Sequence, residues 1–335
     1  MIRFGIVGTG IMGTLYARLI SEHPKTELAA VAGITWEHVD SLAERYGVPG
    51  YLNHQDMFSR ERLDAVYIAT PDFAHTQIVL DAVTADLHIL LEKPMTMRAA
   101  EAEAIVETLS KKPRLKGMLR YGNRWSPPFV AAKQRVESGE LGQILSVNVR
   151  LNDTIYVPTQ MLSWAHQTTP AWFLMTHALD VISWLTGQKA TRISANGVRS
   201  HLLEMGVDTY DVIQALIRYE NGTTGLFESG WVLPLSMPST VDSKYEIIGS
   251  RSTLVIDQLH QTVTHASGSY KFPSTLMTEI DGKLEGYLVY TLSAFVQAIE
   301  NDLPSPVPFE AGLENVRILE AIHQSVEENR PVDVA

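Results

Sequence analysis

Residues 2–13, Ile-Arg-Phe-Gly-Ile-Val-Gly-Thr-Gly-Ile-Met-Gly, decide the fold of the first part of the chain. The apolar run Arg3–Val7 predicts a strand, and residues 11–21 predict a helix. The loop between them has the spacing G-x-G-x-x-G, in which the glycines allow a tight turn, close approach of a pyrophosphate, and helix–strand contact. The helix N-terminus adds free N–H groups and a partial positive charge. We therefore expect dinucleotide binding by Gly8, Thr9, Gly10, Ile11, Met12 and Gly13.

The sequence after this loop predicts two domains. Up to residue 121, short apolar runs alternate with helical patterns, which is typical of a doubly wound parallel sheet. From residue 122 to 335 the pattern favours an α+β domain with a large, mostly antiparallel open sheet. Within it, Asn221-Gly222 is a strong hairpin signal between two alternating segments. An open sheet with helices on one side leaves a face to cover, so we expect a homodimer or homotetramer formed through it.

Composition excludes several functional classes. The chain has 335 residues with a formal net charge of −11, and it contains no cysteine. These values argue against nucleic-acid and membrane-surface partners, and they exclude disulfides, thiolate metal sites and a cysteine nucleophile. No His spacing indicates a metal site. Without a signal sequence or an apolar run of about 18 residues, we expect a cytoplasmic protein.

The second strand bears on which dinucleotide is bound. An acidic residue at its end would bind the ribose 2′-hydroxyl of NAD and repel the 2′-phosphate of NADP. Residues 32–35 are Ala-Gly-Ile-Thr, so no carboxylate is present, and no Lys or Arg is adjacent. We expect Gly33 and Thr35 to face the ribose. The cofactor is predicted to be NAD or NADP, with the balance favouring NADP.

A lysine follows the strand predicted at residues 88–91. Glu92-Lys93-Pro94 lies at the carboxyl edge of the sheet, where doubly wound folds bind ligands. A lysine held there beside a cationic nicotinamide ring would have a lowered pKa, which suits proton exchange with a substrate hydroxyl. The plain alternative is a surface lysine in a turn.

These motifs together resemble the Gfo/Idh/MocA oxidoreductases over nearly the whole chain. The matching segments are residues 8–13, Thr70-Pro71 with His75, Glu92-Lys93-Pro94, Asn123-Arg124, residues 138–142, His177 with Asp180, and residues 328–332. The resemblance implies that Lys93 and His177 assist proton transfer on a sugar, sugar acid or cyclitol. It also implies that Lys93 contacts both cofactor and substrate, and that the cofactor site is lined by Ala69, Thr70, Pro71, His75 and Glu92.

One departure from the family pattern concerns His177. Many relatives carry an Asp one helical turn before this histidine, but here the position is Phe173. We expect Asp180, three residues further along the same helix face, or a backbone carbonyl to hold the imidazole instead. Without a resemblance, a histidine on an apolar helix is more often a satisfied core residue.

Substrate contacts are predicted around the same region. Asn123 and Arg124 follow the last strand of the first domain, and Arg124 could bind an anionic group or form a surface salt bridge. Trp164 and Trp172 flank the loop before His177 and could pack against a sugar ring. Asp180, three residues after His177, is a further candidate for substrate binding.

The sequence as a whole therefore predicts an NAD(P)-dependent oxidoreductase acting on a small carbohydrate-like molecule. Two alternatives remain open at this stage. One is an NAD-dependent glycosidase of the same fold, and the other is a non-catalytic protein that senses a sugar or dinucleotide.

Overall fold

The computed structural model describes residues 1–260, 263–268 and 270–334. The chain forms two compact units, and it passes through each of them twice. The first unit comprises Met1–Gly122 and Glu279–Glu314, and the second comprises Asn123–Thr278 and Asn315–Ala335. The boundary expected near residue 121 lies beside the observed one, but Glu279–Glu314 packs with the first unit.

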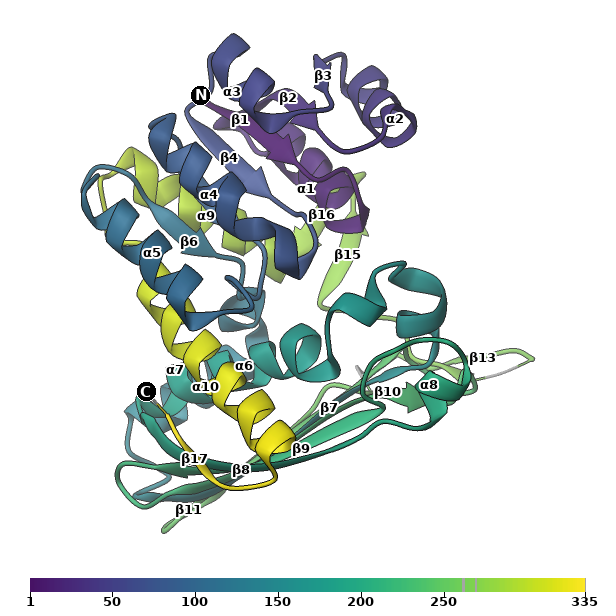
Figure 1. The fold of residues 1–335 in the computed structure, drawn as a ribbon, viewed down its shortest axis with the longest axis vertical. Helices are drawn as coiled ribbons and strands as arrows, with labels where there is room; N and C mark the ends of the chain where they lie inside the picture. The colour runs from purple at the N-terminus through teal and green to yellow at the C-terminus, as the bar shows by residue number, and fades with distance from the viewer. Residues whose placement is uncertain (261–262, 269, 335) are drawn as a thin grey trace. The chain divides into compact units, whose positions relative to one another are not determined.

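The first unit is a six-stranded parallel sheet covered by helices (Figure 1). Its strand order is β3 (Gly50–Tyr51), β2 (Thr26–Ala32), β1 (Ile2–Val7), β4 (Ala65–Ile68), β5 (His88–Leu91) and β6 (Gly117–Leu119). Its helices are α1 (Ile11–Glu22), α2 (Trp36–Tyr46), α3 (His54–Arg60), the short η1 (Asp72–Ala74), α4 (His75–Thr84), α5 (Ala99–Ser110) and α9 (Tyr287–Glu300). All four residues of β4 are buried, as expected of a strand covered on both faces. The doubly wound sheet is confirmed.

The second passage of the chain completes this unit. The ring of Phe295 on α9 packs edge-on against that of Phe4 on β1, with centroids 6.2 Å apart. The Leu119 amide of β6 donates to the Val307 carbonyl at 3.0 Å. A small hairpin of β15 (Met277–Ile280) and β16 (Lys283–Gly286) precedes α9. Residues 279–314 thus supply core and edge contacts that the first 122 residues do not contain.

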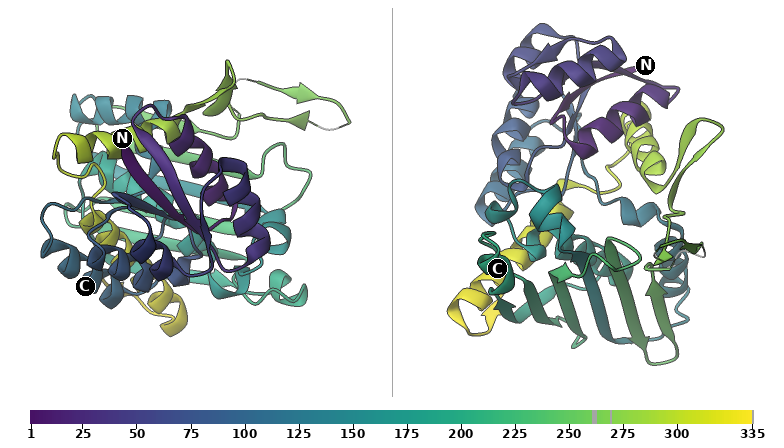
Figure 2. Two further views of the ribbon diagram at one scale, coloured as in Figure 1. Left: turned by 90° about the horizontal axis from the view of Figure 1, so that it is seen from above. Right: turned by 90° about the vertical axis from the view of Figure 1, so that its right-hand side faces the viewer.

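The second unit is a seven-stranded sheet (Figure 2). Its order is β12 (Thr253–Asp257), β11 (Val241–Gly249), β7 (Ile144–Thr154), β10 (Thr224–Leu233), β9 (Val212–Tyr219), β8 (Ala190–Val198) and β17 (Val332–Asp333). Only β7 and β10 pair in parallel, so the expected mostly antiparallel sheet is confirmed. The hairpin predicted at Asn221-Gly222 joins β9 to β10. Strands β13 (His265–Ala266) and β14 (Tyr270–Lys271), which follow β12 in the chain, form a separate two-stranded sheet.

Helices cover one face of this sheet. The helical elements of this unit are η2 (Gly122–Trp125), α6 (Pro127–Glu137), the π-helical turn η3 (Val157–Met161), η4 (Ala165–Gln167), the π-helical turn η5 (Ala171–Met175), α7 (Thr176–Thr186), α8 (His201–Glu204) and the part of α10 (Phe309–Glu328) that begins at Asn315. Residues 171–186 thus form a π-turn followed by an α-helix. The side chains of β7 alternate between the two faces of the sheet, with Val147, Val149 and Leu151 buried and Asn148 and Arg150 exposed.

Candidate active site

The loop after β1 is open at the N-terminus of α1. Gly8 has a φ of +106°, and a Cβ there would lie 2.4 Å from the Ala69 carbonyl oxygen. A Cβ on Gly13 would lie 1.8 Å from the carbonyl oxygen of Gly8, so both positions require glycine. A Cβ on Gly10, in contrast, would meet nothing within 4 Å. No side chain caps α1, which leaves its first N–H groups available to an anion. This loop fits the pyrophosphate of a dinucleotide.

The segment predicted to face the ribose leaves little space at one of its positions. A Cβ on Gly33 would lie 2.7 Å from Oγ1 of Thr9 and 3.0 Å from Cγ2 of Val39, so Gly33 has no room for a side chain. Ile34, the next residue, is 93% exposed. Thr35 begins α2 as its N-cap, and its hydroxyl lies 3.2 Å from Nδ1 of His38. A larger side chain therefore fits at position 34 rather than at position 33.

The ring of His75 joins the loops that follow β4 and β5. It is fully buried, with Nδ1 2.8 Å from the Pro94 carbonyl oxygen and Nε2 2.9 Å from that of Thr70. Both ring nitrogens are thus turned to the backbone. Through these contacts the ring links Ala69-Thr70-Pro71 to the segment that carries Lys93. The hydroxyl of Thr70 is buried and has no hydrogen-bond partner among the described residues.

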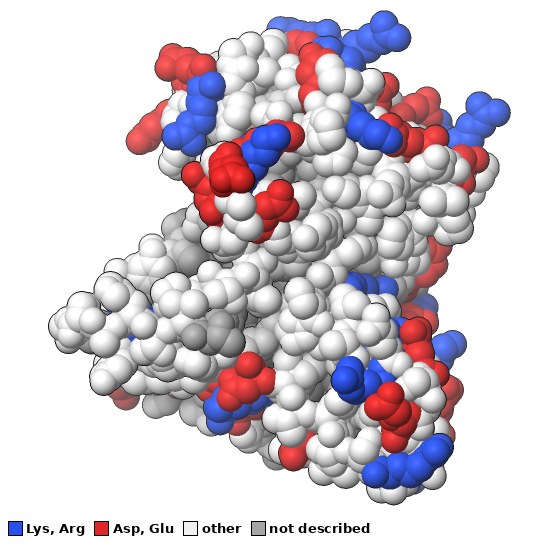
Figure 3. Space-filling model, turned by 180° about the vertical axis from the view of Figure 1, so that it is seen from behind, with Lys and Arg blue, Asp and Glu red and all other residues white. Residues whose placement is uncertain are grey.

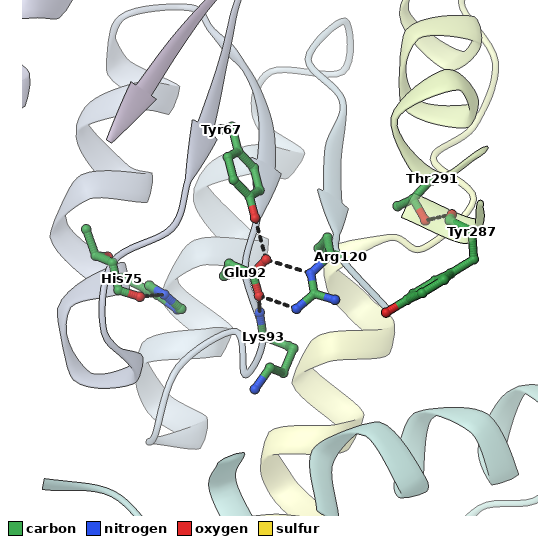
Figure 4. Close-up of polar contacts among 8 residues, drawn as sticks. Tyr67, His75, Glu92, Lys93, Arg120, Tyr287 and Thr291 are labelled. Carbon is green, nitrogen blue, oxygen red and sulfur yellow. Dashed lines mark hydrogen bonds and ion pairs between the residues drawn. The ribbon is translucent and has the colours of Figure 1, made fainter. Parts of the chain in front are cut away.

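Lys93 lies one residue beyond a buried ion pair (Figure 4). The carboxylate of Glu92 accepts two hydrogen bonds from Arg120, at 2.6 and 2.7 Å, and a third from the hydroxyl of Tyr67. Burial by itself would raise the pKa of Glu92, but Arg120 and Tyr67 outweigh it and hold the pKa below its usual value. Glu92 therefore remains ionised.

The ammonium group of Lys93 points away from this network. Figure 4 shows its side chain leaving the backbone on the side opposite the Glu92 carboxylate. The residue is only 6% exposed, so it is not a mobile surface lysine. The sequence predicted Glu92 as a cofactor ligand, but its carboxylate oxygens are engaged by Arg120 and Tyr67. Because Glu92 is bound in this way, it fixes the position of the backbone from which the side chain of Lys93 extends.

In the second unit, His177 lies in the first turn of α7 and is partly buried. Asp180 follows one turn later and is 3% exposed. Its two carboxylate oxygens accept from Arg124, at 2.6 and 3.1 Å. Burial raises the pKa of Asp180, against the opposing charge of Arg124. The two predicted substrate contacts Arg124 and Asp180 are therefore partners of each other, and Asn123 lies beside Arg124 in η2.

The two predicted tryptophans lie in different surroundings. Trp172 is buried and stacks on the ring of His323 from α10, with centroids 4.9 Å apart. Trp164 is half-buried and meets the edge of Phe173 at 6.2 Å. Phe173 in turn packs against Trp231 on β10. Phe173, which stands where many relatives have an Asp, thus belongs to an aromatic cluster with Trp164 and Trp231.

His323 provides a prediction about pH. Its Nδ1 donates to the Leu319 carbonyl at 2.7 Å, its Nε2 lies 2.8 Å from the Thr169 hydroxyl, and burial lowers its pKa to about 4. The unfolded chain binds a proton at this residue below about pH 6.5, whereas the native chain does not until about pH 4, so stability falls as pH falls through this window. We expect a loss of up to about 2 kcal/mol at pH 5.

Denaturant titrations of the native chain and of His323→Gln at pH 7.5 and pH 5 measure this effect. The variant is expected to lose less stability than the native chain between the two pH values. Equal losses in both proteins would contradict the assignment.

Charged side chains of both signs are mixed on the surface seen from behind (Figure 3). On the face in Figure 3, Lys and Arg are interspersed with Asp and Glu, and no patch of one sign dominates. Among the described residues, no group of three or more His, Asp or Glu side chains is placed to hold a metal ion. No helix within the described part of the chain has both the length and the apolarity that a bilayer span requires.

A Rossmann unit with an open phosphate loop, followed by an α/β unit on a large sheet, defines a class of dinucleotide-binding oxidoreductase. The family model described as "Oxidoreductase family, NAD-binding Rossmann fold" matches residues 2–118. The model of the same family's C-terminal alpha/beta domain matches residues 133–334. The chain therefore belongs to the Gfo/Idh/MocA oxidoreductase family, and its first unit is an NAD-binding Rossmann domain.

Individual relatives are distant in sequence but similar over most or all of their length. Myo-inositol 2-dehydrogenase of Thermotoga maritima is 22% identical over 98% of both chains. Inositol 2-dehydrogenase of Rubrobacter xylanophilus is 26% identical over 77% of this chain and 72% of its own. The solved scyllo-inositol dehydrogenase of Lactobacillus casei, with bound NAD(H) and scyllo-inositol, has a TM-score of 0.85 at 22% identity, covering 100% of this chain and 99% of that one. This structural likeness establishes the fold.

Several residues around the site were not predicted from the sequence. Arg120 and Tyr67 belong to no motif that the sequence shows. Glu92 and Arg120 do share one property, because each is the first residue after a strand. The register pairs Leu91 with Leu119, which places those two following residues side by side. A search for charged residues just beyond paired strand ends would have found this ion pair. Asp153, buried near the end of β7, was also missed.

Proposed function

We propose that this protein is an NAD(P)-dependent dehydrogenase that oxidises a ring hydroxyl of a cyclitol or a related sugar. The observation that carries the proposal is the buried Lys93 at the carboxyl edge of the Rossmann sheet, next to the ion pair of Glu92 and Arg120. The names of the relatives support a cyclitol as substrate. The phosphate loop supports a dinucleotide cofactor, whose nicotinamide ring accepts hydride when bound.

In this proposal the residues of the chain bind and orient the reactants and move a proton. Gly8–Gly13 and the first turn of α1 hold the pyrophosphate. Lys93 and His177 act on the same substrate hydroxyl, with His177 taking the proton and Lys93 orienting the oxygen. Trp164, which is half-buried, offers a ring face to the C–H groups of the substrate. Asn123 lies next to the Arg124–Asp180 pair and is a candidate hydrogen-bonding partner for substrate hydroxyls.

Absorbance at 340 nm tests the proposal. The purified protein is incubated with NAD or NADP and a panel of inositols, sugars and sugar acids. We expect reduction of the dinucleotide with at least one inositol. If the dinucleotide binds but no compound is oxidised, the protein is not a dehydrogenase of this class. Release of an aglycone without a net absorbance change would identify a glycosidase instead.

We expect the choice of dinucleotide to depend on position 34. The absence of a carboxylate at residues 33–36 supports acceptance of the NADP 2′-phosphate. Ile34→Asp is expected to raise the ratio of kcat/KM for NAD over that for NADP at least about fivefold, and Ile34→Arg to lower it similarly, because a unit charge at about 4 Å contributes about 1 kcal/mol in water. Both shifts should shrink at high salt. Identical ratios in the three proteins would show that residue 34 does not face the ribose.

We also propose that the protein self-associates through the outer face of the seven-stranded sheet. In the views of Figures 1 and 2 no helix covers this face. Leu216 and Leu226, which are paired across β9 and β10, are about half exposed on it. Light scattering on the eluting protein measures its mass, and a monomer at all concentrations would contradict the proposal.

A further inference from the structure

Asp153 is a buried carboxylate on the helix-covered face of the second sheet. It is 2% exposed and continues the row formed by Val147, Val149 and Leu151 on that face of β7. The pairing of β7 with β11 runs without a shift from Leu151 to Asp153, so the alternation of faces is kept. Its neighbour Asn152 points to the other face, where it donates to Glu228 at 2.8 Å. Asp153 therefore points toward the elements that carry Phe173 and His177.

Packing at two levels of the sheet defines how these elements lie along β7. Phe173 of η5 packs against Trp231, which follows Gly230, the partner of Asn152 in the register. One end of the helical segment thus lies at the level of residues 152–153. At the other end, the ring of Tyr245 packs against Phe129 of α6, with centroids 4.9 Å apart, and Lys133, one turn later on α6, donates to the Trp184 carbonyl of α7 at 2.7 Å. The charge of Asp180 on α7 adds to the effect of burial and raises the pKa of Tyr245 further. Tyr245 is the register partner of Val149.

The two spans have equal length. From residue 152 to 149 the strand covers about 10 Å, and from residue 173 to 180 the helical segment covers about 10 Å. The segment therefore runs antiparallel to β7, and His177 begins about 6 Å from the Phe173 end, above Leu151. Helical side chains lean toward the N-terminus of their helix, which directs the imidazole back toward the level of Asp153.

We propose that Asp153 positions the imidazole of His177 and supplies the carboxylate that is missing at Phe173. The inference rests on the proposed function for its catalytic meaning, but the pairing itself is a statement about the second unit alone. A carboxylate next to the ring stabilises the imidazolium that forms when His177 takes a proton from the substrate hydroxyl. It also keeps the ring in one orientation, as carboxylates that support catalytic histidines do.

The other charged groups near His177 are already engaged. On the same helix, the carboxylate of Asp180 accepts hydrogen bonds from two nitrogens of the Arg124 guanidinium. Lys133 of α6 donates to the Trp184 carbonyl at the far end of α7. On α10, Asn315 bonds to Thr176, and His323 stacks on Trp172 with a lowered pKa. Tyr245 of β11 is buried. Asp153 is the buried acid that the sheet contributes at this level.

Titration of His177 followed by NMR tests the pairing without substrate. The His177 ring signal is assigned by its loss in His177→Gln, and its pKa is measured in the native chain, in Asp153→Asn and in Asp153→Glu. We expect the His177 pKa to fall by about one unit or more in Asp153→Asn and to be largely restored in Asp153→Glu. Asp242→Asn is the matched control, because Asp242 is a buried carboxylate on β11 that pairs with Arg150 on the other face. It should leave the titration unchanged.

Kinetics then test the catalytic role. In Asp153→Asn we expect kcat to fall about 10- to 100-fold with a smaller change in KM, and the acidic limb of the kcat/KM profile to move to lower pH. Adding Phe173→Asp to this variant should restore part of kcat, because the carboxylate returns one helical turn before His177.

The outcomes separate the two proposals. If the His177 titration is the same in Asp153→Asn as in the native chain, the inference is wrong whatever the enzyme oxidises. A shifted titration in a protein that oxidises no compound would leave the pairing intact and overturn the proposed function. If Asp153→Asn does not fold, the comparison of Asp153→Glu with the native chain decides the matter.

Discussion

Lys93→Met is expected to lower turnover at least about 100-fold while dinucleotide binding is retained, because a positioned acid–base group contributes about 10²–10⁴ in rate. Methionine keeps much of the volume of the buried side chain but removes its charge and its donors. The phosphate loop lies at the end of β1 and does not involve Lys93, so the dissociation constant for the dinucleotide should change little. Steady-state kinetics and dinucleotide fluorescence measure the two effects separately.

The matched control is Lys116→Met. Lys116 is also largely buried in the first unit, but it precedes β6 and therefore lies at the opposite edge of the parallel sheet, paired with Asp302 at 2.6 Å. Its replacement should cost some stability and leave turnover per folded molecule unchanged. Equal turnover in Lys93→Met and the native protein would remove Lys93 from the mechanism.

Arg120→Met is expected to lower the free energy of unfolding by about 3–5 kcal/mol, because it leaves the carboxylate of Glu92 buried without its counter-charge. Replacing the whole cluster, as Arg120→Met with Glu92→Met and Tyr67→Phe, should recover most of this loss, since apolar groups of similar volume often substitute for a buried ion pair. Urea unfolding followed by circular dichroism measures both.

The comparison between the single and the triple variant is what tests the ion pair. If the free energy of unfolding of Arg120→Met falls by less than about 1 kcal/mol, then Glu92 does not depend on Arg120 for its counter-charge. Such a result would contradict the prediction. If the triple variant recovers stability but not turnover, that result would support a second role for the network, which is to hold the backbone of Lys93 in place.

The sequence pattern predicted helices, strands and turns more successfully than it predicted which side chains pair with each other over long distances along the chain. Gly8–Gly13, the parallel strands and the hairpin at Asn221-Gly222 could be predicted because each depends on neighbouring residues. The pairing of Arg124 with Asp180 could not, because the two are 56 positions apart and are brought together only by the packing of η2 against α7. The sequence treated them as two separate substrate contacts for this reason.

The same limit explains the missed carboxylate. Helical spacing indicates side-chain partners for His177 only on its own helix, where the residues one turn away are Phe173 and Asp180. Asp153 is on a strand 24 positions earlier, and its relevance appears only when the register and the packing of η5 are known. The return of residues 279–314 to the first unit was likewise invisible, because an apolar helix such as α9 carries no mark of the sheet it covers.

That return has a consequence for how the chain is made. Phe4 on the first strand and Leu119 on the last both depend on contacts with residues near 295–307. On the ribosome, nearly the whole polypeptide must be translated before these partners emerge, so the amino-terminal unit matures late rather than first, contrary to the usual order for multidomain proteins. A truncated product that ends near residue 122 would expose this surface and should require chaperones to stay dispersed.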